Sequence, residues 1–245
     1  MKLIFRGTRG NIKAKSARHR RHTSTMICYR GSCILIDFGA DWAGTLLPKE
    51  VRAIFISHAH PDHVDGLKRG VHCPIFATAE SWEVMKNFAI EERCVLKERS
   101  VVQVGALAIE PFAVEHALNA PAVGYRITGG SATIFYVPDL VKIRRQAQAL
   151  RNVDLYIGDG AVVSRYLLVR SRDGQHIGHS PIAEQLKWCA KAGIRRMVVT
   201  HCGTEITSGL PDEIERRLHE LGREFGVQVL LACDGMELAI RGGGR

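Results

Sequence analysis

Four potential metal ligands fall within six residues of this chain, directly after an apolar run. The run, Ala53–Ile56, is continuously apolar, as expected of a strand that is covered on both faces. The candidates after it are His58, His60, Asp62 and His63. Alternate residues of an extended chain point the same way, so the first two imidazoles can face one ion. Pro61 ends the extension, which lets the last two ligands turn towards a second metal, and a helix is expected to start near His63.

The residue types in this cluster point to transition-metal chemistry. Imidazole nitrogen suits zinc and similar metals, and a carboxylate adds compensating charge. The chain has 11 histidines in 245 residues, so three within six positions beside an aspartate are hard to obtain by chance. The spacing therefore predicts a metal site rather than a set of surface histidines.

The pattern His-x-His-x-Asp-His after a hydrophobic strand resembles the signature of the metallo-β-lactamase superfamily. That resemblance calls for a third histidine after a later strand, an aspartate after another, and a last histidine after a strand near the C-terminus. The sequence supplies His116, Asp139 and His201, each directly after a strand-like run or one residue beyond it. Open α/β sheets commonly carry ligand sites at such strand ends. The resemblance extends from Leu3 to His201.

The resemblance implies a role for each of these residues. It implies one metal on His58, His60 and His116, a second on Asp62, His63 and His201, and a bridge between them from Asp139. Two divalent ions about 3.5–4 Å apart activate a water and take up charge at the attacked centre. Asp62 would also act in catalysis by orienting that water. Zinc or manganese is expected, and iron suits the same donors.

Two further positions matter to this ligand set. Pro138 stands before Asp139, where relatives often have glycine, and it could tilt the carboxylate. Asp37, in Asp37-Phe38-Gly39, fits an Asp-x-Gly segment that lies near the site in the family. We interpret Asp37 as an orienting or turn residue rather than a ligand.

The order of apolar runs predicts the fold class. Strand-like runs come first, at Lys2–Phe5, Met26–Tyr29, Ile34–Asp37, Leu107–Val114, Val123–Thr128, Thr133–Val137 and Val153–Ile157. A helix then follows Ser180-Pro181, an N-cap and first-turn proline, and ends at Gly193. The strand Arg196–Thr200 separates it from a second helix, Asp212–Phe225. This order predicts a layered α/β sandwich, and the resemblance implies a four-layer αββα sandwich of the metallo-β-lactamase type. We expect one domain over residues 1–240 and a disordered tail over residues 241–245.

Composition and charge indicate the kind of partner, the cellular location and the state of the cysteines. The net charge of +9 favours anionic partners, and residues 12–22 carry five lysines and arginines without an acid. No apolar run reaches the ~18 residues of a membrane span, and the N-terminal apolar segment is too short for a signal peptide. We therefore expect a cytoplasmic protein without a membrane partner.

Seven cysteines, an odd number without a C-x-x-C pair, argue against a disulfide framework and predict free, mostly buried thiols.

A second histidine motif indicates the branch of the family. Gly178-His179-Ser180 resembles the extra motif of the phosphodiesterase branch, which includes ribonuclease Z and the cyclic-phosphate phosphodiesterase of phosphonate degradation. The resemblance implies that His179 is catalytic and contacts the scissile phosphate or protonates the leaving oxygen. The alternative is a histidine in a turn.

The N-terminal loop resembles the same branch. Gly7-Thr8-Arg9-Gly10 and the later Thr23-Ser24 are similar to its Gly-Thr-Gly loop and the Thr-Ser that follows. Arg20, Arg21 and His22 are accordingly candidates to bind a substrate phosphate, together with Arg18. The alternative is that these arginines are solvated.

These features predict a metal-dependent hydrolase, a phosphodiesterase acting on a small or nucleotide-like phosphodiester. Ribonuclease Z carries a tRNA-gripping arm between the third histidine and the bridging aspartate, and residues 117–138 leave no room for one. An RNA-processing nuclease, with nucleic acid as its partner, is therefore less favoured than an enzyme for small phosphodiesters. A thioesterase or lactonase, which needs no His179, and a non-catalytic nucleic-acid-binding module also fit the sequence. A homodimer is expected by analogy only, and Asp159 has no assigned role.

Overall fold

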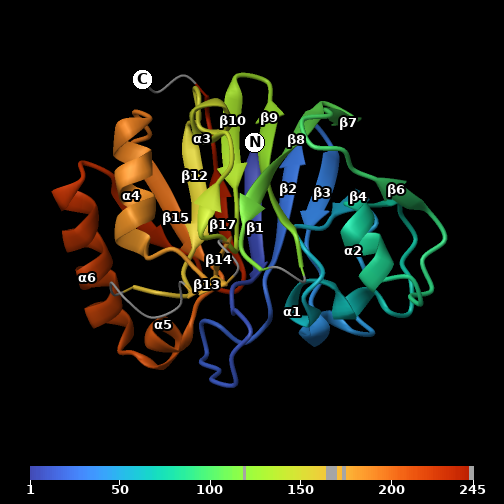
Figure 1. The fold of residues 1–245 in the computed structure, drawn as a ribbon, viewed down its shortest axis with the longest axis horizontal. Helices are drawn as coiled ribbons and strands as arrows, with labels where there is room; N and C mark the ends of the chain where they lie inside the picture. Colours follow the sequence, from blue (N-terminus) through green and yellow to red (C-terminus); the bar gives the residue numbers. More distant parts are fainter. Residues whose placement is uncertain (118–119, 164–169, 173–174, 243–245) are drawn as a thin grey trace.

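Two mixed β-sheets form the centre of the molecule, which is a computed structural model (Figure 1). The structure describes residues 1–117, 120–163, 170–172 and 175–242, with the backbone alone at residues 170–172, 175 and 176. The predicted disordered tail begins inside this part at Arg241, and its residues 243–245 lie outside it.

The first sheet has seven strands among the described residues, in the order β17-β1-β2-β3-β4-β5-β6. Their bounds are β1 Lys2–Gly7, β2 Ser24–Tyr29, β3 Ser32–Ile36, β4 Val51–Phe55, β5 Ile75–Ala77, β6 Arg93–Val95 and β17 Met236–Ala239. The first and last strands of the chain are neighbours, because β1 pairs antiparallel with β17. The return of the C-terminal segment to this sheet is absent from the sequence prediction.

The second sheet runs in the order β11-β8-β9-β10-β12-β15-β16, with β7 paired to β8. Its strands are β7 Val102–Val104, β8 Leu107–Glu115, β9 Ala122–Gly129, β10 Ala132–Tyr136, β11 Lys142–Ile143, β12 Leu155–Asp159, β15 Arg196–Thr200 and β16 Gln228–Leu231. A separate hairpin joins β13 (Arg170–Arg172) to β14 (Gln175–Ile177). The strands β10, β12, β15 and β16 are parallel, so their carboxyl ends meet at one edge.

The inner faces of the two sheets pack against each other. Their shared core includes Phe5, Ile34 and Phe55 from the first sheet and Ile127 and Ile157 from the second, all fully buried. Burial of each such side chain stabilises the fold by about 1.5–3 kcal/mol. The alternation of buried residues along β1 and β8 is what a strand with one covered face requires.

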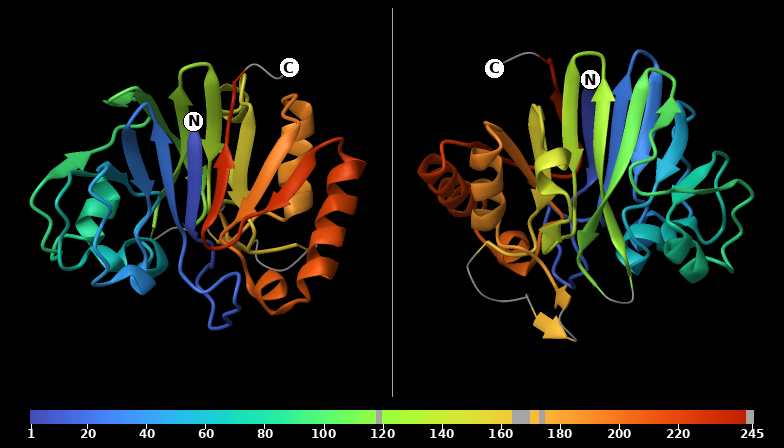
Figure 2. Two further views of the ribbon diagram at one scale, coloured as in Figure 1. Left: turned by 180° about the vertical axis from the view of Figure 1, so that it is seen from behind. Right: turned by 45° about the horizontal axis from the view of Figure 1, so that its top comes forward.

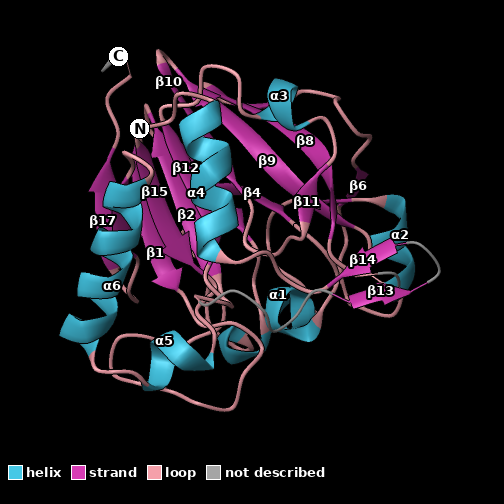
Figure 3. Ribbon diagram, turned by 60° about the vertical axis from the view of Figure 1, so that its left-hand side comes forward, coloured by secondary structure: helices cyan, strands magenta, loops and turns pink. Residues whose placement is uncertain are grey.

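Helices cover both outer faces. The helices α3 (Gln146–Ala149), α4 (Ile182–Lys191), α5 (Thr204–Ser208) and α6 (Pro211–Glu224) belong to the second sheet's side, and η1 (Ala40–Trp42), α1 (Pro61–Val64), η2 (Asp65–Leu67) and α2 (Ala79–Val84) to the first sheet's side. Figure 3 shows α4 in front of β12 and β15, which it contacts, and α6 contacts β16. The layers confirm the predicted αββα sandwich.

The predicted helix starts were partly wrong. The helix α4 begins at Ile182, with Pro181 as its N-cap and no side-chain cap. Ser180 is buried instead: its amide donates to the Leu140 carbonyl and its carbonyl accepts from the Gln185 side chain. These tertiary hydrogen bonds replace the local capping bond. Gly193 follows the helix at φ 72°, as its predicted end requires.

The cysteine prediction was wrong for one pair. Cys28 and Cys33 lie directly opposite each other on β2 and β3 and form a disulfide. An odd count of cysteines carries no information on such a cross-strand neighbour, which follows from the two-residue turn at Arg30 and Gly31, both with positive φ. The other five cysteines are free, and three of them are buried. No helix in the described part of the chain is long and apolar enough to cross a membrane.

Candidate metal centre

The predicted ligands meet at one end of the two sheets, where several strands terminate. His58 and His60 follow β4, His116 follows β8, Asp139 follows β10 and His201 follows β15. Pro61 starts α1 with His60 as its N-cap, so the chain turns where the sequence predicted and carries Asp62 and His63 back towards the strand ends. Figures 1 and 2 show α1, α5 and the N-terminal loop at this same end.

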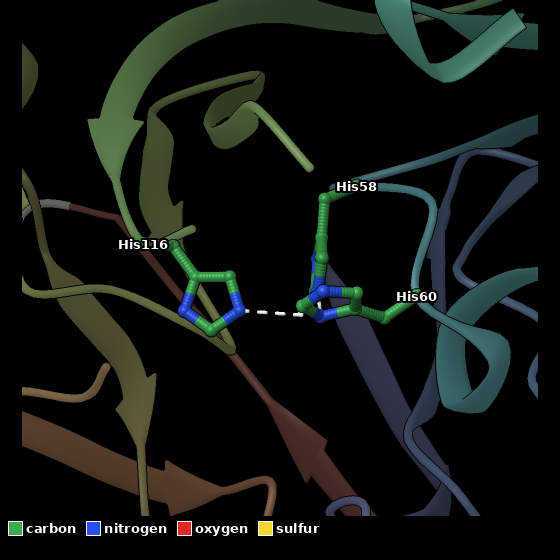
Figure 4. A group of neighbouring side chains, drawn as sticks. All are labelled: His58, His60 and His116. Atoms are coloured by element: carbon green, nitrogen blue, oxygen red, sulfur yellow. Dashed lines mark hydrogen bonds between the residues drawn. The ribbon is translucent and has the colours of Figure 1, made fainter. Parts of the chain in front are cut away.

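Three imidazoles form the first group, shown in Figure 4. The Nδ1 atom of His60 lies 2.9 Å from Nε2 of His58 and 3.3 Å from Nε2 of His116. One nitrogen from each ring lies within 4.8 Å of the others. Nitrogens gathered in this way can hold one ion.

A second group forms around Asp62. Its Oδ2 atom lies 3.2 Å from Nε2 of His63 and 3.2 Å from Nε2 of His201. Asp139 lies between the groups, because Oδ2 is 2.8 Å from His63 and 3.6 Å from His58 while Oδ1 is 3.2 Å from His201. The preceding proline therefore leaves the Asp139 carboxylate inside the cluster.

Several polar atoms of the cluster are buried without a well-formed hydrogen bond. These atoms are Nε2 of His63, Nδ1 of His201 and both carboxylate oxygens of Asp139. A buried polar atom without a partner costs about 1–3 kcal/mol. Divalent cations in the cluster would give these atoms the partners that they lack. The donor set and its orphaned atoms thus fit a divalent-metal site.

The pKa shifts of three members of the cluster favour the same fit, whereas at His63 and His201 the neighbouring carboxylates outweigh burial and raise the pKa, to about 9 for His201. Burial lowers the pKa of His60 to about 4, and the neighbouring His116 adds to the shift. Burial and the charge of His63 hold the pKa of His58 well below its usual value. Burial opposes ionisation of Asp139, but the imidazoles of His201 and His116 outweigh it and hold that pKa well below its usual range. Neutral imidazole and ionised carboxylate are the forms that bind metals.

Buried partners fix the orientation of the ligands. Asp37 accepts from Nδ1 of His63 at 2.8 Å and from the backbone amide and hydroxyl of Ser57. The Nδ1 atom of His116 lies 3.0 Å from the carbonyl of Gly178. Gly39 lies against α1 so closely that a Cβ atom would sit 1.7 Å from the Asp62 carbonyl. The Asp-x-Gly segment therefore supports the ligands from behind, as interpreted from the sequence.

His179 lies between two carboxylates beside this cluster. Its Nδ1 atom is 2.7 Å from Oδ2 of Asp159 and 3.1 Å from Oδ1 of Asp139. Burial lowers the His179 pKa, but the two carboxylates outweigh it and raise the pKa to about 11. Asp159, left unassigned by the sequence, is fully buried and also accepts from the amides of Leu140 and Ala161. The sequence signal that could have assigned Asp159 to the site is its position two residues after the strand-like run Val153–Ile157.

A cavity of about 720 Å³ opens in front of the cluster. Its polar lining includes His60, Asp62, His116, Asp139, His179 and His201. Apolar walls come from Ile12, Ala117, Val162 and Ile177, and Asn11, Thr204 and Glu205 complete the rim of described residues. The cluster is therefore open to a small molecule from this cavity.

The structure places the candidate phosphate-binding residues outside this cavity. Arg20 and Arg21 line a separate hollow that they share with Lys15 and Asp41. Arg21 stacks on Trp42, with its guanidinium carbon 4.5 Å from the ring centre. Nδ1 of His22 lies 3.0 Å from the Asp41 carboxylate. Contact of these residues with a substrate stays a prediction, and it requires a ligand that extends beyond the cavity. The neighbouring Gly10, by contrast, lines the cavity as predicted.

Known proteins share this architecture. Over 98% of both chains, the sequence is 23% identical to a protein named Ribonuclease Z from Methanopyrus kandleri, in an alignment of 285 positions. The metallo-β-lactamase fold protein YhfI from Bacillus subtilis superposes with a TM-score of 0.73 and 19% identity over 97% of this chain and 98% of its own. A diphosphatase from the PhnP family gives a TM-score of 0.72 and 20% identity over 98% of each chain.

A family model settles the membership. The model described as the Beta-lactamase superfamily domain matches residues 33–202. That span contains all seven predicted ligands, from His58 to His201. Since the match covers most of the chain, the protein belongs to the β-lactamase superfamily and has the metallo-β-lactamase fold.

Proposed function

We propose that this protein is a metal-dependent phosphodiesterase. The observation that carries the proposal is His179, which faces the cavity beside the cluster and has its Nδ1 atom held by Asp159. A hydrolase that uses only an activated water has no need of His179, an imidazole beside the cluster that is oriented by its own carboxylate, Asp159. The names of the similar proteins, Ribonuclease Z and a PhnP-family diphosphatase, support the same reaction class.

The proposal assigns two divalent cations to the cluster. His58, His60 and His116 would hold one, Asp62, His63 and His201 the other, and Asp139 would contact both. When bound, such ions supply a water nucleophile at neutral pH and neutralise charge at the attacked phosphate. Zinc, manganese and iron all suit these donors, and we expect zinc or manganese.

Two side chains have proposed catalytic roles. Oδ2 of Asp62 lies 3.2 Å from Nε2 of both His63 and His201, which leaves Oδ1 to orient a water on the cavity side. His179 has Nδ1 occupied, so Nε2 is the ring atom free to reach a substrate oxygen. From there it can stabilise a phosphate oxygen or donate a proton to the leaving alcohol. Asp159 positions this ring rather than touching substrate.

An acyl hydrolase is the second candidate. The apolar side chains of Ile12, Val162 and Ile177 in the cavity wall are what a thioesterase or lactonase would need for an acyl chain. A ribonuclease is a third candidate, because relatives carry that name. A non-catalytic nucleic-acid-binding module, cytoplasmic location and a homodimer stay predictions.

A substrate panel separates these candidates. Metal-loaded protein is assayed on bis(p-nitrophenyl) phosphate, p-nitrophenyl acetate and a lactam, with His179→Ala alongside. We expect fast phosphodiester cleavage that falls in the variant because His179 no longer stabilises the phosphate oxygen. The fall should be smaller than the about 10²–10⁴-fold usual for a general acid, since p-nitrophenolate leaves without a proton. Turnover of the acetate or lactam, without any on the phosphodiester, would move the function to acyl chemistry. An unchanged rate in His179→Ala would remove the role given to this residue.

A further inference from the structure

One carboxylate that the metal centre does not use faces the cavity. Glu205 lies in α5, directly after the segment that carries His201, and lines the cavity together with Thr204. The neighbouring walls are apolar, from Ile12, Val162 and Ile177. Among the lining residues in the described part of the chain there is no lysine or arginine. A substrate group in this part of the cavity therefore meets apolar carbon and a negative charge.

Backbone contacts fix the position of this carboxylate relative to the metal ligands. The amide of Gly203 donates to the Gly160 carbonyl at 3.0 Å. A Cβ atom on Gly203 would sit 2.1 Å from the Ala161 carbonyl oxygen, so only glycine allows this approach. Oε1 of Glu205 lies 3.0 Å from the guanidinium of Arg217 on α6, and its side chain keeps 33% exposure. Arg217 does not line the cavity, so the carboxylate is the charge that faces a ligand.

We propose that Glu205 determines substrate specificity as a charge filter. The cavity would accept a phosphodiester whose second substituent is neutral or cationic and donates hydrogen bonds to the carboxylate. It would discriminate against a substituent that bears another phosphate. This inference rests on the proposed phosphodiesterase function and narrows its substrate class to small or terminal diesters rather than the interior of a polyanionic chain.

The basic N-terminal loop does not cancel this charge. Lys15 binds Asp41 at 3.1 Å and Arg18 binds Glu215 at 2.5 Å. None of the five basic residues of the loop lines the cavity. Glu205 is itself paired with Arg217, but Glu205 lines the cavity and Arg217 does not, so its carboxylate lies nearer than these cations to an anionic substituent inside the cavity.

A matched pair of probes tests the filter. Thymidine 5′-(p-nitrophenyl phosphate) and its 3′-phosphorylated derivative share the scissile bond and differ by one remote phosphate. We expect kcat/KM to favour the first by at least about tenfold, the scale of one repulsive charge pair near a protein surface. Glu205→Gln should reduce the ratio to about two, while Glu213→Gln, the same charge change at an exposed residue of α6, should leave it intact. Because salt screens charges, the wild-type ratio should also fall towards one between 0.1 and 1 M salt, where the screening length shrinks from about 10 to 3 Å.

Binding of the two products gives a readout that needs no turnover. Titration calorimetry with thymidine 5′-monophosphate and thymidine 3′,5′-bisphosphate should show the same preference and the same loss of it in Glu205→Gln. A ratio that Glu205→Gln leaves unchanged, or a wild-type preference for the bisphosphate, would overturn the filter. Selective binding without cleavage of either probe would support the filter and count against the phosphodiesterase itself.

Discussion

The metal cluster and the wall of its cavity are built in different ways. The cluster consists of buried side chains at strand ends, with His58 and His63 fully buried and Asp139 only 2% exposed. The wall comes from short loops and from α5, and it includes exposed residues such as Asn11 and Thr204. The cluster is therefore held by the core of the fold, whereas the wall is free to vary without disturbing it.

This difference separates the residues proposed to carry out the reaction from those proposed to select the substrate. A substitution in the cluster should remove the metal and all turnover, because each ligand also has a fixed, buried partner such as Asp37 for His63. A substitution in the wall should leave the metal in place and change which substrates are used. The predictions below probe this division from the largest expected effect to the smallest.

Loss of a central ligand should abolish activity. His63→Ala removes a nitrogen 2.8 Å from Asp139, so we expect reduced metal content and a fall of about 10⁴-fold or more in kcat/KM, since metal ions contribute several kcal/mol. Metal analysis and diester assays measure both. His72→Ala, an exposed histidine, is the control. Full metal content and activity in His63→Ala would show that the cluster is not the metal site.

Loss of the partner of His179 should have a smaller effect that spares the metal. Asp159→Asn weakens the contact to Nδ1 of His179, and we expect kcat to fall about 10–100-fold with KM little changed. The fall should be larger for alkyl than for p-nitrophenyl leaving groups, because a poor leaving group needs the proton more. In the double variant with His179→Ala the effects should not add; full additivity would mean that Asp159 acts elsewhere.

The N-terminal loop contains a buried histidine, His19, which should make stability depend on pH. Burial lowers the pKa of His19 to about 4, Asp234 opposes the shift and Arg18 adds to it. The unfolded chain binds the proton at about pH 6.5, so this contribution is complete above pH 6.5 and is lost as the pH falls towards 4. We expect a loss of at most about 1.4 kcal/mol per pH unit. Urea unfolding of wild type and His19→Gln should show a steeper pH dependence in the wild type; equal slopes would contradict the assignment.

The smallest effect is expected at Arg20 and Arg21, of which the first is exposed and the second half-buried. Arg20→Ala and Arg21→Ala change the hollow beside Asp41, outside the cavity. For bis(p-nitrophenyl) phosphate we expect less than about a twofold change in kcat/KM, because exposed charges contribute only about 0–1 kcal/mol. A tenfold loss on this small substrate would place the arginines in the site and contradict the proposed division between cluster and wall.

Sequence reasoning captured the cluster and missed much of the wall, for a physical reason. The predicted ligands His58 and His116 stand one residue beyond apolar strand-like runs. The spacing of the first cluster located His58, and the resemblance to the metallo-β-lactamase superfamily located His116. Glu205 lies in a five-residue helix, whose contact with the cavity depends on how α5 packs. The disulfide between Cys28 and Cys33 depends on the register of the β2–β3 hairpin. The return of β17 to β1 depends on long-range strand pairing, which no local pattern in this sequence encodes.

The most direct test measures metal content and diester hydrolysis in one preparation. Wild-type protein is stripped with a chelator, reloaded stepwise with zinc or manganese, and followed by mass spectrometry of the metal and by bis(p-nitrophenyl) phosphate cleavage. We predict that hydrolysis disappears on stripping and returns as the ratio approaches two ions per chain. Cleavage that survives complete metal removal, or a fully loaded protein that hydrolyses only carboxyl esters or lactams, would contradict a metal-dependent phosphodiesterase.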